Sequence, residues 1–134
     1  MTSRVSMALL LMLVFAGCAE ELGPEQFVTT RVHGTVLFGK KPVTRGWIEF
    51  WPTDGGVGVM RSAPIQPDGS FDATRVPVGR NAIGFTGTDL PRRLASEFQI
   101  LRTRIRREIP EGPRSELKID LLDEFARLTK DAGI

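Results

Sequence analysis

The tight corner at Asp68-Gly69 constrains this chain more than any other feature. It lies between the β-prone apolar residues Ile65 and Phe71, and glycine accepts the positive φ that a tight turn requires. An Asp-Gly pair flanked in this way is a strong signal for a β-hairpin. Val76-Pro-Val-Gly79 follows shortly and is expected to end one strand and begin the next, over residues 81–86. The two corners predict short, closely spaced strands.

Alternation of apolar and polar residues places further strands on both sides of these corners. Residues 28–38 alternate from Val28 onward, and Ile48 and Phe50 point one way while Trp47, Glu49 and Trp51 point the other. The residues expected in the core are Val32, Val36, Phe38, Ile48, Phe50, Phe71, Ile83 and Phe85. Short strands separated by glycine and proline predict a mainly β chain folded as an antiparallel β-sandwich or barrel.

Four segments together resemble the carboxypeptidase regulatory-like domains, which are transthyretin-like (prealbumin-like) β-sandwiches often found on bacterial envelope lipoproteins. They are Val32-His-Gly-Thr-Val-Leu-Phe-Gly-Lys-Lys-Pro-Val43, Gly46-Trp-Ile-Glu-Phe-Trp-Pro52, Asp68-Gly-Ser-Phe71 and Val76-Pro-Val-Gly79. The resemblance implies an antiparallel sandwich over residues 28–122, with Asn81 at a position that is commonly aromatic. Because the matching residues are turn and core residues, the resemblance implies a fold and no reaction.

Residues 1–17 have the layout of a secretory signal peptide, with one charge (Arg4) before an apolar run too short to span a bilayer. Phe15-Ala-Gly-Cys18 resembles the lipobox of bacterial lipoproteins, with Phe15 in place of the usual leucine. The resemblance implies that Cys18 carries diacylglycerol and becomes the mature N-terminus, with residues 18–27 as a tether. Ala19 after the cysteine favours the outer membrane or cell surface. The alternative is an ordinary secreted protein with one buried thiol.

After Thr88 the apolar period changes to that of a helix. Leu90, Leu94, Phe98, Leu101 and Ile105 fall on one helical stripe. With Pro91 suited to the first turn and Pro110 as the stop, they predict an arginine-rich amphipathic helix over residues 90–109. Its stripe is expected to contact Trp47 or Trp51 through Leu94, Phe98 or Leu101.

A final strand that includes Leu117, Ile119 and Leu121 is expected next. A C-terminal segment, residues 123–134, follows it, and residues 122–131 favour a short helix.

The scarcity of reactive side chains limits the chemistry. The chain has one histidine, one cysteine and no tyrosine, so a zinc site of histidines and cysteines cannot be assembled. Asp68-x-Ser70-x-Asp72 begins like a calcium loop, but Ala73 stands at the position of the required glycine, which favours a plain turn. His33 is interpreted as a solvent-facing strand residue, with a catalytic base as the alternative. We therefore expect no enzyme activity, catalytic residue, metal or cofactor.

Two features indicate binding. Trp47 and Trp51 are about 13 Å apart along their strand and could stack on sugar rings or hold a protein partner, unless the helix covers them. Arg102 and Arg106 could meet polyanions such as lipopolysaccharide phosphates, unless they are simply solvated. A formal net charge of +2 gives no reason to expect nucleic acid. The first hypothesis is a non-enzymatic envelope lipoprotein with a structural or adhesive module; the second is a glycan- or polyanion-binding protein.

Overall fold

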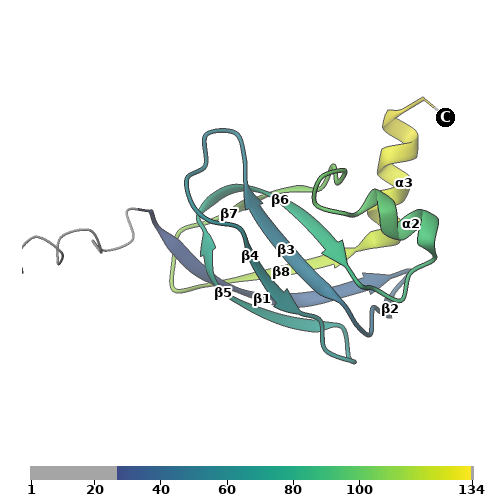
Figure 1. Ribbon diagram of the computed structural model, residues 1–134, viewed down its shortest axis with the longest axis horizontal. Coiled ribbons are helices and arrows are strands. Elements are labelled where there is room, and N and C mark those ends of the chain that lie inside the picture. The colour runs from purple at the N-terminus through teal and green to yellow at the C-terminus, as the bar shows by residue number, and fades with distance from the viewer. Residues whose placement is uncertain (1–26, 134) are drawn as a thin grey trace, which may run out of the picture.

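A computed structural model describes residues 27–133 and arranges them in two β-sheets with a helix at the C-terminal end (Figure 1). The strands are β1 (Thr29–Phe38), β2 (Lys41–Pro42), β3 (Trp47–Pro52), β4 (Arg61–Pro64), β5 (Ser70–Pro77), β6 (Gly79–Thr86), β7 (Arg106–Ile109) and β8 (Arg114–Asp120), and the helices are α2 (Arg92–Glu97) and α3 (Leu121–Asp131). The predicted mainly β, two-sheet architecture is confirmed. The predicted signal peptide, Cys18 and nearly all of the tether lie outside the described residues.

The first sheet is built around β1. This strand pairs antiparallel with β2 and β5, and parallel with β8 in the register Arg31↔Arg114 to Leu37↔Asp120. The prediction of a wholly antiparallel sandwich is therefore wrong for the last strand. Parallel neighbours need a long crossover connection. Here the connection between β1 and β8 contains all four strands of the second sheet, and it ends at Arg114, beside Arg31 near the start of β1.

The second sheet has the order β4-β3-β6-β7 with antiparallel neighbours. The Asp68-Gly69 corner forms as predicted, with Gly69 at φ +84° and the Gln66 N–H donating to the Ser70 carbonyl at 2.8 Å. It does not close a hairpin, because β4 belongs to the second sheet and β5 to the first. Ile65 and Phe71 are both buried, so the turn connects the two sheets while the residues on each side of it contribute to the same core.

The corner at residues 76–79 also carries the chain from one sheet to the other. β5 ends at Pro77 and β6 begins at Gly79, so the predicted break between two strands is confirmed, with the second strand starting two residues earlier than predicted. Asn81, at the commonly aromatic position, is fully buried, and its Nδ2 donates to the carbonyls of Pro77 at 2.8 Å and Gly79 at 3.1 Å. Asn81 therefore stabilises this corner through hydrogen bonds. An aromatic residue at the same position would stabilise it through packing.

Inward-facing residues of both sheets form a single core. Seven of the eight predicted core residues are buried, and Phe38 packs against them while partly exposed. The rings of Phe50 in β3 and Phe71 in β5 lie 6.2 Å apart between centroids and join the two sheets. Val28, which begins the predicted alternation, precedes β1 and is exposed.

Of the predicted helix over residues 90–109, only Arg92–Glu97 is helical. After α2 the chain runs along the edge of β6, where the Phe85 N–H donates to the Phe98 carbonyl at 2.7 Å and the Ile83 N–H to the Ile105 carbonyl at 3.1 Å. Strand β7 continues this pairing. Phe98 and Ile105 are buried in the core, whereas Leu101 is 83% exposed. Pairing an open strand edge satisfies backbone groups that a helix would have left unpaired.

The C-terminal helix is longer than predicted by one residue at its start. Leu121 was expected to end the last strand, but it opens α3 and is fully buried. Asp120 is the N-cap and accepts a hydrogen bond from the Leu122 N–H at 3.0 Å, which satisfies one of the free donors at a helix start. Phe125 packs against the core as expected.

Replacement of Phe50 by alanine tests the core. Because Phe50 is fully buried against Phe71, the Phe50→Ala variant should lose about 3–5 kcal/mol of unfolding free energy. Urea denaturation measures this loss. The neighbouring variant Trp51→Ala, which removes a half-exposed ring, should lose much less. Equal losses, or a larger loss at Trp51, would contradict the strand register described above, since a shift of one residue exchanges the two faces.

Candidate functional site

Trp47 and Trp51 stand on the outer face of the second sheet. Their neighbours Ile48 and Phe50 are fully buried, and alternate strand residues face opposite ways. Trp47 is 47% and Trp51 44% exposed, so the predicted outward placement of both side chains is confirmed. Glu49 lies between them on the same face. We call Trp47, Glu49 and Trp51 the tryptophan face.

Small side chains flank the tryptophan face on the neighbouring strands. Glu49 pairs with Ser62 on one side and Gly84 on the other, while Trp51 pairs with Ala82. Residues paired across antiparallel strands share a face of the sheet. Ala82 and Gly84 are themselves buried, so the accessible part of this face is formed by the two half-exposed indoles with Glu49 between them.

A loop formed by residues 99–103 borders this face. Ile83 and Phe85 are buried, so Gly84 between them faces outward, and a Cβ added to it would lie 2.7 Å from the backbone nitrogen and Cα of Ile100. The Thr103 hydroxyl holds the loop by donating to the Ile83 carbonyl at 2.7 Å. The chain that was predicted to cover the indoles as a helix therefore lies over the adjacent strand β6.

Phe98 and Leu101, two of the three side chains predicted to contact the tryptophans, take other positions. Phe98 is fully buried and packs edge-on against Phe85, with ring centroids 6.4 Å apart. Leu101 is almost wholly exposed, and Leu94 is half-buried on α2. Neither indole is buried as a result. The interpretation in which the tryptophans belong to a covered, purely structural surface thus loses its main support.

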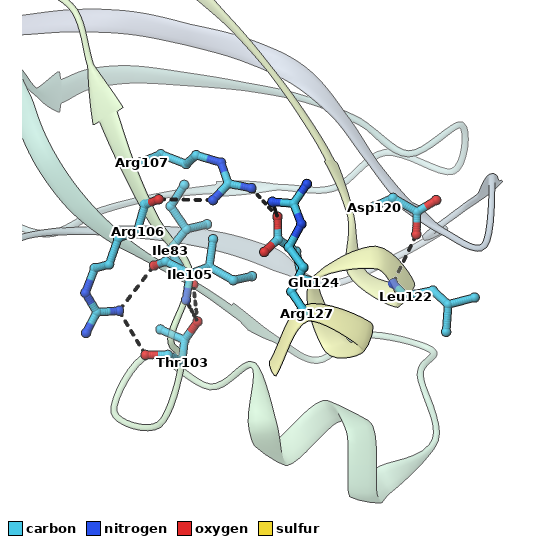
Figure 2. A network of polar contacts seen from close by, with 9 residues as sticks. All are labelled: Ile83, Thr103, Ile105, Arg106, Arg107, Asp120, Leu122, Glu124 and Arg127. Atoms are coloured by element: carbon cyan, nitrogen blue, oxygen red, sulfur yellow. Dashed lines mark hydrogen bonds and ion pairs between the residues drawn. The ribbon is translucent and has the colours of Figure 1, made fainter. Parts of the chain in front are cut away.

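Arg106 shares the outer face with Trp51, two strands away. Arg106 pairs with Ala82, and Ala82 pairs with Trp51, which corresponds to about 10 Å between the outer strands. Its guanidinium donates to the carbonyls of Thr103 at 2.9 Å and Ile105 at 3.2 Å (Figure 2). Arg102 is exposed in the 99–103 loop. Arg106 therefore supports the loop, and Arg102 is the more available cation.

Glu124 and Arg107 form a second polar cluster, which the sequence did not indicate. Glu124 on α3 is largely buried and forms an ion pair with Arg107 on β7, and Arg127 approaches the same carboxylate at 3.8 Å (Figure 2). Arg107 also donates to the Arg106 carbonyl at 3.0 Å. These groups line a cleft of about 310 Å³ beside α3. Because the Glu124 carboxylate on α3 pairs with Arg107 on β7, we assign this cluster to the docking of α3.

Asp120 joins this helix to the turn after β1. Its carboxylate accepts hydrogen bonds from the Gly39 and Lys40 N–H groups, both at 2.9 Å, besides capping α3. Burial raises the pKa of the Asp120 carboxyl, but the N–H donors of Lys40, Gly39 and Leu122 outweigh it and hold the pKa below its ordinary value. An aspartate just before a helical pattern is a recognisable N-cap signal, so this role could have been found from the sequence.

The remaining sequence candidates have local structural partners. His33 accepts a hydrogen bond at Nδ1 from the Arg114 Nε at 2.9 Å. Asp68 accepts from the Ser70 N–H at 3.0 Å and from its hydroxyl at 2.6 Å, a local turn arrangement. Among residues 27–133, no group of three or more histidine, cysteine or acidic side chains is placed to hold a metal ion. The same part of the chain contains no helix long and apolar enough to cross a membrane.

No protein-family model, curated protein or solved structure matches this chain. The candidate site is therefore defined by the residues and geometry described above.

Replacement of Gly84 by alanine tests whether the loop rests on β6. The added methyl group would meet the Ile100 backbone at 2.7 Å, so the Gly84→Ala variant should lose about 1–3 kcal/mol of stability through overpacking. Thermal denaturation measures the loss. Ser62→Ala, on the far side of the tryptophan face, is the matched control and should remain near wild type. Identical melting temperatures for the two variants would mean that the loop lies elsewhere.

Proposed function

We propose that this chain is a bacterial envelope lipoprotein, attached to a membrane through diacylglycerol on Cys18, whose β-domain is a non-enzymatic adhesive module. The observation that carries the adhesive role is the tryptophan face, with two half-exposed indoles in one row of one strand. The lipid attachment is supported by the lipobox resemblance at Phe15–Cys18 and the signal-peptide layout before it. Its location is the cell envelope, at the outer membrane or cell surface.

The ligand that suits this face best is an envelope glycan. An indole ring offers a flat apolar surface for the face of a sugar ring, and the two rings are about 13 Å apart. The Glu49 carboxylate between them accepts hydrogen bonds of the kind that sugar hydroxyls donate. An envelope protein that uses the same indoles as central contacts is the second possible partner.

Binding of a polyanion is the less favoured form of the same proposal. Of the two arginines singled out in the sequence, Arg106 directs its guanidinium to backbone carbonyls, and only Arg102 is exposed in the bordering loop. These two arginines therefore supply a single available cation, which is weak support for a highly charged ligand. We therefore expect stacking on the indoles to provide most of the affinity and salt to have little effect on it.

We assign the domain to the carboxypeptidase regulatory-like, transthyretin-like sandwiches as part of this proposal. The support is the set of motifs in residues 32–79 together with their use in the fold, because both Gly-containing corners connect one sheet to the other. The non-enzymatic role rests on the scarcity of histidine, cysteine and tyrosine in the sequence.

Replacement of Cys18 by serine tests the lipid attachment. The wild-type protein, made in a bacterial host, should incorporate a fatty-acid analogue and enter the detergent phase, and Cys18→Ser should lose both properties. The circular dichroism of the two proteins should agree, since β1 begins only at Thr29. A wild-type protein that carries no label and stays in the aqueous phase would disprove the attachment.

Tryptophan fluorescence tests the adhesive face directly, because the chain has two tryptophans and both lie on it. Iodide should quench the free protein, and purified envelope polysaccharide should protect it. Trp47→Ala and Trp51→Ala should each weaken binding by at least about tenfold, as expected when a central aromatic contact is removed.

Leu122→Ala is the matched control, since Leu122 is an exposed apolar residue on α3 with an exposed fraction close to that of Trp51. This variant should bind like the wild type. An unchanged affinity in both tryptophan variants would exclude this face as the binding surface. A large loss in Arg102→Ala, relieved at high salt, would favour a polyanion over a neutral glycan.

A further inference from the structure

Exposed apolar side chains gather at the end of the domain where the chain arrives from Cys18. Among residues 27–133, four of the eight large hydrophobic residues that are strongly exposed lie here, and Val57 is 65% exposed. The four are Val28, which precedes β1, and Val57, Val59 and Met60, which lie between β3 and β4. With Phe27 they form what we call the end patch.

Three members of the end patch border one cleft, and Val59 and Met60 follow Val57 in the same loop. Phe27, Val28 and Val57 line the same cleft, of about 670 Å³. The Phe27 ring lies against the β3–β4 loop, since a Cβ on Gly58 would be 3.2 Å from its Cδ2 atom. Figure 1 shows this loop at the same end of the sheets as the start of β1, far from α3.

The polar groups at this cleft are partly neutralised. The Arg80 guanidinium pairs with the Asp54 carboxylate at 3.1 Å, and both residues line the cleft. Glu108, which pairs with Arg80 in the β6–β7 register, adds a second carboxylate to the lining. The end patch is therefore apolar with a polar border, as expected for a surface that meets the boundary between lipid headgroups and acyl chains.

The length of chain before the domain indicates what covers the patch. Phe27 follows Cys18 by nine residues, and nine residues span at most about 32 Å when fully extended. Lipid on Cys18 would hold the end patch within this distance of the bilayer and at a high effective concentration. Even a weakly apolar surface then binds the membrane, because the lipid attachment has already removed most of the entropy cost of association.

We infer that the end patch rests on the phospholipid bilayer to which Cys18 is attached, with Val57, Val59 and Met60 at the level of the headgroups. The inference depends on the proposed lipidation and adds an orientation to it. The domain stands with its N-terminal end on the membrane and α3 directed away. The tryptophan face then lies on its side wall, since β3 leads through Pro52 into the loop that carries the patch.

A site-specific fluorophore tests this orientation. Cys18 is the one cysteine of the chain, so in the lipidated protein a newly introduced cysteine is the sole free thiol. Val59→Cys and, as a second probe, Met60→Cys place a bimane label on the patch. Ala126→Cys places it on the exposed surface of α3 as the control. Each full-length, lipidated protein is reconstituted in phosphatidylcholine vesicles that contain spin-labelled lipid.

The bimane at residues 59 and 60 should show blue-shifted emission and strong quenching by the spin-labelled lipid, and that at residue 126 should show neither. Quenching at the patch no greater than at residue 126, in protein whose mass includes the diacylglycerol, would overturn the inference and leave the lipid attachment intact. A mass without lipid would instead overturn the attachment and the inference with it. A blue shift that depends on protein concentration in the absence of vesicles would identify a second copy of the chain as the occupant and also overturn it.

Discussion

The backbone N–H and C=O groups at the edge of β6 need hydrogen-bond partners. The segment that supplies these partners also determines the outer surface of the second sheet. Residues 98 and 105 accept the N–H groups of Phe85 and Ile83, and β7 extends the pairing. A helix over the same residues would have bonded internally and left the edge of β6 to water. The residues between 98 and 105 therefore form a loop away from the edge, and this loop packs against Gly84 beside the tryptophan face.

The two sheets present different outer surfaces to solvent. On the first sheet, Arg31 forms an ion pair with Asp72, and this hydrogen-bonded pairing holds the pKa of the Asp72 carboxyl below its ordinary value. Arg114 donates to His33 beside them. The second sheet also has an exposed ion pair, Arg80–Asp54, but it differs from the first sheet in exposing two indoles on its outer face. Exposed ion pairs contribute little to stability, whereas exposed aromatic rings lose unfavourable contact with water when a ligand covers them. The proposed adhesive role therefore rests on the outer face of the second sheet.

Alternation in the sequence identified most of the buried side chains, because every residue in a strand faces one side or the other, but it failed at the strand ends, where Val28 is exposed and Phe38 partly exposed. It could not assign strands to sheets: the turn at Asp68-Gly69 is present, yet its flanking strands lie in different sheets. Nor could it distinguish a helical stripe from an irregular edge, since Phe98 and Ile105 are buried in either case and only the open edge of β6 decides between them. The Arg107–Glu124 pair joins residues 17 positions apart on different elements, and no local pattern marks such a contact.

The two proposals together restrict the direction in which a ligand runs. A line through both indoles follows β3, and β3 leads toward the end patch. If the patch lies on the bilayer, Trp51 is nearer to the lipid than Trp47, by up to the 13 Å that four strand residues span. A glycan that stacks on both rings then extends away from the membrane surface along the side of the domain. This geometry suits chains that project from the same membrane better than a polymer layer that lies parallel to it, because such a layer would meet only one indole at a time.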